Sequence, residues 1–285
     1  MKIIECPRDA MQGIDEFMPT ENKIRYINQL LKVGFDTIDF GSFVSPKVIP
    51  QMKDTSTVYR GLELNSTRSK LLAIVANQRG ARDASLFEKI DYLGFPLSIS
   101  ETFQRRNTNM SIDEAVKELD VIKSICVQSS KKLVVYISMG FGNPYGDPYG
   151  VNTVSSFVKS MIDLGADVLS IADTVGVASA KEVSELFGAL IPQFPHIEIG
   201  VHLHARSQDA HDKVLAAYNA GCRRIDGALK GYGGCPMAND SLVGNIPTEL
   251  LIAALDSIGA PVTLDRTALQ HALACASATF PAQHL

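Results

Sequence analysis

The chain has 285 residues, 46% of them hydrophobic, so it can bury the core of one large domain of the size that α/β barrels routinely reach. Its formal net charge of −4 argues against a nucleic-acid partner and against an anionic membrane surface, because both bind through clustered lysine and arginine. The five cysteines are odd in number and irregularly spaced, so they predict no disulfide framework and favour a reducing, cytoplasmic compartment.

The predicted elements alternate along the chain: a short run rich in β-branched residues is followed by a turn and then by a longer stretch with helical periodicity. The first run, at residues 1–6, predicts a strand rather than a signal peptide, and no apolar run approaches membrane-spanning length. Strands are predicted at residues 2–6, 36–40, 71–76, 92–99, 133–138, 168–172, 197–204 and 224–228. The clearest helices are predicted at residues 20–33, 111–129, 153–164, 180–191, 207–220 and 248–258.

About eight βα units in a chain of this length favour a closed (β/α)8 TIM barrel over an open, doubly wound sheet. The best marked helix start is at Ser111, which can cap the first turn while Glu114, three residues later, completes a capping box. No low-complexity linker divides the sequence. We therefore predict a single barrel domain over residues 1–285.

In such a barrel the active groups lie at the carboxyl ends of the strands. Asp9 follows the first predicted strand, and His202 and His204 belong to the seventh. The two histidines are two positions apart on a strand, so their side chains project to the same side and can share one cation. The alternative is that one histidine belongs to the core and the other to the surface. A mixed set of nitrogen and oxygen ligands suits Mg²⁺ or Mn²⁺.

Further polar residues follow the other predicted strands. They are Arg8 after the first, Asp39 and Ser42 at the end of the second, Asn77 to Arg79 after the third, Ser100 and Glu101 after the fourth, and Asp173 with Thr174 after the sixth. The alternatives are structural: Arg8 and Asp9 could form an exposed ion pair, and Asp173 could cap a helix.

A glycine-rich segment, Gly231-Tyr-Gly-Gly-Cys-Pro-Met-Ala238, places a thiol shortly after the paired histidines. Its glycine and proline residues favour a mobile, exposed loop at about 231–245 over the active site; the alternative is that Cys235 is an inert packing residue. Cys235 has no second cysteine at the spacing typical of zinc sites, so structural zinc is not expected.

Several segments resemble the 3-hydroxy-3-methylglutaryl-CoA (HMG-CoA) lyase family, and the resemblance runs nearly from end to end. They are Pro7-Arg-Asp-Ala-Met-Gln12, Ser42-Phe-Val-Ser-Pro-Lys47 with Pro50-Gln-Met52, Ser100-Glu-Thr-Phe103 with Arg106-Asn-Thr-Asn109, Asp173-Thr-Val-Gly176, His202-Leu-His204 and Gly231-Tyr-Gly-Gly-Cys-Pro236. The Arg-Asp start and the paired histidines are shared with a wider metallolyase superfamily that includes isopropylmalate and homocitrate synthases. The serine-phenylalanine and cysteine segments are narrower and indicate the lyase.

The resemblance implies a lyase that cleaves HMG-CoA to acetyl-CoA and acetoacetate with Mg²⁺ or Mn²⁺, in leucine breakdown and ketone-body formation or a related route. The matching residues are Asp9, His202, His204 and Asn245 as metal ligands, Arg8 as the group that stabilises charge on the thioester oxygen, Asp39 at a position that is usually glutamate, Cys235 in proton transfer, and Gln12, Ser42 and Asp173 beside the substrate. We take His202 as the preferred base for the substrate hydroxyl. Glu249 also matches an acidic residue of the family, although a helix start favours an acid there in any case.

The chain departs from the family pattern at several positions. The usual His-x-His-Asp-Thr is completed here by Ala205 and Arg206, so a carboxylate beside the second histidine is missing, which could loosen the orientation of the ligands. Asp39 is one methylene shorter than glutamate, and residues 142–147 also differ. The stretch from Cys235 to Asn245 is one residue longer than expected. These differences leave the metal chemistry intact but could alter the acyl group that is accepted.

Other functions remain open: an acyl-CoA-dependent synthase of the same superfamily, a lyase for another 3-hydroxyacyl-CoA, or a non-catalytic acyl-CoA-binding protein that kept the barrel. The cysteine loop and the lack of an appended regulatory domain argue against the synthase. The retained Arg8, Asp9, histidine pair and Cys235 argue against the binding protein. The expected partners are an acyl-CoA thioester and further copies of the chain in a homo-oligomer, a dimer or larger, with no nucleic acid and no membrane.

Overall fold

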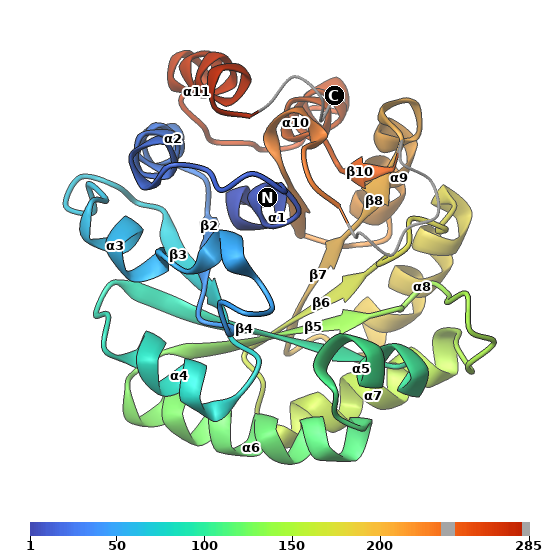
Figure 1. Cartoon of the computed structure of the whole chain (residues 1–285). Coiled ribbons are helices and arrows are strands. Elements are labelled where there is room, and N and C mark those ends of the chain that lie inside the picture. Colours follow the sequence, from blue (N-terminus) through green and yellow to red (C-terminus); the bar gives the residue numbers. More distant parts are fainter. Residues whose placement is uncertain (235–242, 281–285) are drawn as a thin grey trace.

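The computed structural model describes residues 1–234 and 243–280, and its centre is a closed barrel of parallel strands (Figure 1). The strands follow one another in the order β1, β2, β3, β4, β5, β6, β7 and β9, and β9 closes the barrel by pairing with β1. Their bounds are β1 Lys2–Glu5, β2 Thr37–Ser42, β3 Lys70–Ile74, β4 Ile90–Ser98, β5 Lys132–Ser138, β6 Val168–Ala172, β7 Glu198–His202 and β9 Arg224–Gly227. The predicted (β/α)8 TIM barrel is confirmed.

The seventh strand ends earlier than the sequence pattern predicts. β7 stops at His202, and the chain then leaves the barrel as β8 (His204–Ala205), which pairs antiparallel with β10 (Gly244–Asn245). His204 lies opposite Asn245 in this pair. The small two-stranded sheet therefore brings two candidate ligands together from distant parts of the sequence.

Helices surround the barrel (Figure 1). They are α1 Pro7–Gln12, α2 Thr20–Val33, α3 Thr55–Arg60, α4 Gln78–Ser85, α5 Glu101–Thr108, α6 Ile112–Gln128, α7 Val151–Leu164, α8 Ala180–Gln193, α9 Ser207–Asn219, α10 Thr248–Ser257 and α11 Arg266–Thr279, with short 3-10 helices η1 Pro50–Met52 and η2 Leu229–Gly231. The six predicted helices agree with α2, α6, α7, α8, α9 and α10, and the capping box of Ser111 and Glu114 is formed. The helices that the sequence pattern does not predict include α1, α3, α4 and α5, which have only six to eight residues and so show little periodicity.

The interior of the barrel has an apolar side and a polar side. From β3 to β6 it is filled by one cluster, Leu72, Ile74, Tyr92, Val134, Tyr136 and Val168. On the other side Arg224 and Asp226 of β9 are both 1% exposed. Gly200 of β7 makes room for this arginine, because a Cβ at that position would lie 2.9 Å from Cδ of Arg224. The polar side continues toward the carboxyl ends of the strands, where the candidate site lies.

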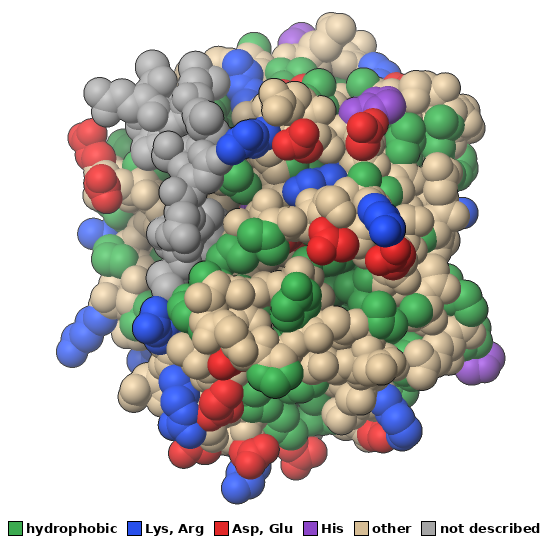
Figure 2. Space-filling view, turned by 90° about the vertical axis from the view of Figure 1, so that its right-hand side faces the viewer, with side chains coloured by type: hydrophobic (Ala, Val, Ile, Leu, Met, Phe, Trp, Pro, Cys, Tyr) green, Lys and Arg blue, Asp and Glu red, His purple; other side chains and the backbone are tan. Residues whose placement is uncertain are grey.

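Figure 2 shows one face of the molecule, on which lysine and arginine side chains are interspersed with aspartate and glutamate rather than gathered in a single basic area. Within the described residues, none of the helices has both the length and the apolar content that crossing a membrane requires.

Candidate active site

Some of the polar residues predicted at the strand ends line a cavity of about 370 Å³ at the carboxyl end of the barrel. The candidate site residues that line it are Arg8, Asp9, Gln12, His202 and His204. Apolar side chains, among them Val44, Ile49 and Phe103, form other parts of its wall. The cavity is therefore charged in one part and apolar in another.

Arg8, Asp9 and Gln12 come from α1, which begins directly after β1. Pro7 suits the first helical position, because its φ is already helical and its missing N–H would have no partner there. Nη1 of Arg8 donates to Oδ1 of Asp9 at 2.9 Å and to Oε1 of Gln12 at 2.8 Å. Nε2 of Gln12 donates to the same Asp9 oxygen at 2.8 Å. One helical turn thus gathers three side chains at a place where the sequence predicts the loop after a strand.

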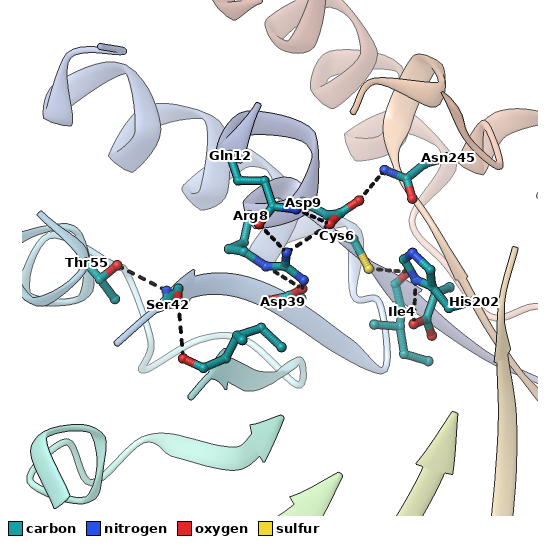
Figure 3. A network of polar contacts seen from close by, with 12 residues as sticks. Ile4, Cys6, Arg8, Asp9, Gln12, Asp39, Ser42, Thr55, His202 and Asn245 are labelled. Carbon is teal, nitrogen blue, oxygen red and sulfur yellow. Dashed lines mark hydrogen bonds and ion pairs between the residues drawn. The ribbon is translucent and has the colours of Figure 1, made fainter. Parts of the chain in front are cut away.

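Asp39 of β2 fixes the other edge of the same guanidinium (Figure 3). Its Oδ2 accepts hydrogen bonds from Nε of Arg8 at 3.0 Å and from Nη2 at 2.5 Å. The side chain has no solvent exposure, and burial raises the pKa of Asp39 to about 6 although the Arg8 charge acts in the opposite direction. The carboxylate is therefore ionised at neutral pH, and it holds Arg8 in one orientation.

Asn245 reaches Asp9 from β10. Its Nδ2 donates to Oδ2 of Asp9 at 2.7 Å and to the carbonyl oxygen of Tyr232 at 2.9 Å. Both partners can only accept, so the amide nitrogen must face them, and Oδ1 is the atom of Asn245 that can serve as a metal ligand. The neighbouring Gly233 packs against α1: its φ is +79°, and a Cβ there would lie 2.6 Å from the carbonyl oxygen of Asp9. Glycine is required at that contact.

The paired histidines are oriented through their Nδ1 atoms. Nδ1 of His202 lies 3.1 Å from Oδ2 of Asp226, and Nδ1 of His204 lies 3.1 Å from the carbonyl oxygen of Thr174. A carboxylate and a carbonyl oxygen only accept, so each Nδ1 carries a proton and each neutral ring presents a lone pair at Nε2. The two Nε2 atoms face each other at 3.3 Å. Two lone pairs at this distance need a cation or a proton between them.

The pKa values agree with this arrangement. Burial lowers the pKa of His204 to about 4, and the charge of His202 acts in the same direction. Burial also disfavours the charged form of His202, but Asp226 and Asp9 outweigh it and raise the pKa of His202 above its ordinary value. Burial opposes ionisation of Asp9, but Arg8 and the histidines lower its pKa to about 2. Of the two rings, His202 therefore takes up a proton more readily than His204, and a divalent cation held by the two Nε2 atoms would compete with that proton.

A carboxylate oxygen of Asp9 and one nitrogen each of His202 and His204 lie within 4.8 Å of one another and could hold a metal ion. Cys6, His202 and Asp226 form a second group within the same limit. A neutral imidazole has one lone pair, so His202 cannot serve both groups, and its hydrogen bond to Asp226 favours the first. The three carboxylates of Asp9, Asp39 and Asp226 outnumber the two buried cations that act on them, Arg8 and Arg224, so these charges favour a further cation here.

Ser42 does not line the cavity directly. Its Oγ donates to the carbonyl oxygen of Ile74 at 3.3 Å and accepts from the N–H of Val44 at 3.1 Å, so it shapes the loop that does line the cavity. Its predicted contact with substrate stays a prediction. Cys235 lies outside the described residues.

Asp173 and Glu249 both accept hydrogen bonds from backbone N–H groups. Oδ1 of Asp173 accepts from the N–H of Val177 at 2.9 Å, and Oε2 of Glu249 accepts from the N–H of Lys230 at 3.0 Å. Asp173 is 1% exposed and is not part of the cavity lining. The N–H donors to Asp173 lie in the loop before α8, whose N-cap is Ser179, so Asp173 orders a loop rather than capping that helix, and its role beside the substrate stays a prediction.

Asp226 and Thr174 are partners of the histidines that the sequence pattern does not predict. A signal for Asp226 exists, since a carboxylate inside a predicted strand is seldom fully buried without a partner. The partner atom of Thr174 is a backbone carbonyl oxygen, which leaves no trace in the sequence.

The HMGL-like family model matches residues 2–275 of the chain. The chain belongs to this family. A relative from Danio rerio, named 3-hydroxy-3-methylglutaryl-CoA lyase, cytoplasmic, is 32% identical over 266 residues, which cover 93% of this chain and 78% of that protein. The solved HMG-CoA lyase from Brucella melitensis has a TM-score of 0.90 at 28% identity and covers 97% of both chains.

A second solved member is an HMG-CoA lyase from Acinetobacter baumannii in complex with coenzyme A and 3-methylmalate. It has a TM-score of 0.88 at 31% identity and covers 98% of this chain and 90% of that one. The family that the sequence motifs indicate is therefore confirmed for this chain.

Proposed function

We propose that this protein is a divalent-metal-dependent carbon–carbon lyase that cleaves HMG-CoA to acetyl-CoA and acetoacetate. The observation that carries the proposal is the pair of histidine Nε2 atoms, 3.3 Å apart, with the Asp9 carboxylate close by and Arg8 on the same cavity. The family relatives named HMG-CoA lyase, one of them in complex with coenzyme A, support the choice of substrate.

Breaking the bond between C2 and C3 of this substrate requires a base for the 3-hydroxyl proton, stabilisation of the thioester enolate, and an acid that reprotonates C2. When bound, a divalent cation lowers the pKa of the hydroxyl group and fixes its orientation. We assign its ligands to Asp9, His202, His204 and Asn245. Oxygen and nitrogen ligands without a thiolate favour Mg²⁺ or Mn²⁺.

Arg8 stabilises the negative charge that develops on the thioester oxygen. A guanidinium group has five N–H donors, and four of those of Arg8 are used by Asp9, Gln12 and Asp39. The second N–H of Nη2 has no acceptor among the described residues, and we assign it to the substrate. Because its neighbours hold the group in place before the substrate binds, this donor is preorganised, and a donor of that kind contributes ~3 kcal/mol to a transition state.

His202 is our candidate base, with Asp226 as the residue that stabilises its charged form. The ring accepts a proton at Nε2 while Nδ1–H donates to Asp226 at 3.1 Å. Nε2 has a single lone pair, so it accepts this proton only while that lone pair is not bound to the metal. Cys235, outside the described residues, is the proposed proton donor to C2.

The cavity suits an acyl-CoA thioester. Val44, Val48, Ile49 and Phe103 give it an apolar wall against which a pantetheine arm can lie. We extend the proposal to one catalytic domain over residues 1–285, a homo-oligomer of two or more chains, and a cytoplasmic location. Light scattering of the purified protein tests the assembly.

The test is to incubate the purified protein and Mg²⁺ with HMG-CoA and with other 3-hydroxyacyl-CoA thioesters, and to identify the products by mass. We expect acetyl-CoA and acetoacetate from HMG-CoA. Cleavage of a different thioester alone would change the substrate, and condensation of acetyl-CoA with a 2-oxo acid would indicate a synthase. No turnover of any thioester would refute the proposal.

A further inference from the structure

Lys213 of α9 is buried beside the strand that carries His204. It is 6% exposed, and its Nζ donates to the carbonyl oxygen of His204 at 2.9 Å and lies 3.5 Å from Oδ2 of Asp173. An ammonium group loses hydration when it is buried, so it is stable there only with hydrogen-bonding partners. These two contacts therefore determine where the side chain lies.

Asp173 connects Lys213 to the loop that follows β6. Its carboxylate accepts from the N–H of Val177 at 2.9 Å and from the N–H of Ala178 at 3.1 Å. Thr174 belongs to the same loop, and its carbonyl oxygen lies 3.1 Å from Nδ1 of His204. Lys213 thus contacts the main chain of His204 directly, and it contacts through Asp173 the loop that orients the His204 ring.

We propose that Lys213 is a positioning residue for the metal site, which it serves by holding His204 with Nε2 turned toward His202 and Asp9. The inference rests on the proposed metal-dependent function. The family pattern has an aspartate at the position of Ala205, and in this chain the main chain of the second histidine is held by a lysine on α9 whose partner lies on the β6 loop.

Two variants separate positioning from simple stability. Lys213→Met removes the ammonium group but leaves the charge of Asp173 buried without its partner, which alone could unfold the protein. Lys213→Met combined with Asp173→Asn removes both charges, and the asparagine Oδ1 can still accept from the loop N–H groups. The double variant is therefore the informative one.

Lys131 offers a matched control. It is also 6% exposed, and its Nζ donates to the carbonyl oxygens of Phe87 at 2.8 Å and Ile90 at 2.7 Å. It directly precedes β5, so it lies at the amino end of the barrel, away from the metal site. Lys131→Met should lower the thermal midpoint and leave the affinity for metal unchanged.

The measurement is the Mn²⁺ affinity of the wild type, both Lys213 variants, Lys131→Met and Asp9→Ala, with the thermal midpoint of each metal-free protein. We expect the double variant to bind Mn²⁺ at least about tenfold more weakly than the wild type, the usual scale for losing a residue that orients a ligand. An affinity equal to that of the wild type would overturn the role of Lys213. If Asp9→Ala also bound like the wild type, the metal site itself would be wrong.

Discussion

The two sides of the barrel interior differ in what they contribute. Between β3 and β6, residues such as Leu72 and Val134 pack without charge, and burial of their apolar surface stabilises the barrel. On the other side Asp39, Arg224 and Asp226 are buried with their charges, and Oδ1 of each aspartate has no hydrogen-bond partner among the described residues. Buried charge is costly, and it persists where it orients groups that act. The apolar side therefore stabilises the fold, and the polar side positions the groups that act.

The strongest test of the polar side is Asp39→Ala. It removes the partner of Nε and Nη2 of Arg8, so the guanidinium loses its orientation and activity should fall by about a thousandfold. Asp39→Glu restores the carboxylate and should retain substantial activity. Steady-state kinetics of both variants measures this, and an alanine variant as active as the wild type would remove Asp39 from the mechanism.

Cys235, which lies outside the described residues, is the proposed proton donor to C2. Cys235→Ser keeps the size of the side chain but raises the pKa of the proton donor, so kcat should fall by at least about a hundredfold with KM little changed. Thiol alkylation should inactivate the wild type, and substrate should protect it. Normal turnover by the serine variant would make Cys235 a packing residue.

On the apolar side, Leu72→Ala should lower the stability of the fold and leave the metal site unchanged. Leu72 is fully buried, and the cavity left by its truncation should lower the free energy of unfolding by about 3 kcal/mol. The affinity for Mn²⁺ should not change. Urea unfolding and metal titration measure the two quantities, and a large loss of metal affinity would mean that the two sides are not separate.

The smallest effect on activity is expected for Glu5, a buried acid away from the metal ligands. It accepts from the N–H of Leu229 at 2.8 Å and from Oγ1 of Thr248 at 2.6 Å, and burial raises its pKa to about 8. A raised pKa means that the folded protein keeps a proton which the unfolded chain releases. This contribution to stability is therefore complete below about pH 4 and is lost as the pH rises toward 8.

Glu5→Gln removes that titration and should keep the hydrogen bonds. Thermal unfolding of both proteins is measured between pH 5 and pH 8. As the pH rises, the free energy of unfolding of the variant should increase relative to that of the wild type, by no more than about 1.4 kcal/mol per pH unit. Parallel curves would mean that Glu5 does not titrate in this range.

The sequence pattern was sufficient for the barrel and for the family, because β-branched runs and long amphipathic helices have clear periods. It also predicts that His202 and His204 share one side of a strand, although β7 ends between them. It could not predict α1, which is only six residues long, or the roles of Asp226 and Lys213. The roles of Asp226 and Lys213 depend on contacts between different elements, and the closed barrel determines those contacts.

The central claim is that the polar side holds one catalytic divalent cation. The most direct measurement is HMG-CoA cleavage by metal-stripped protein, followed by addition of Mg²⁺ or Mn²⁺, with His204→Ala as the comparison. We expect no cleavage after stripping, full recovery on addition of either ion, and little recovery in the variant, whose affinity for metal should also fall. Full activity of the stripped protein would contradict the assignment of the site.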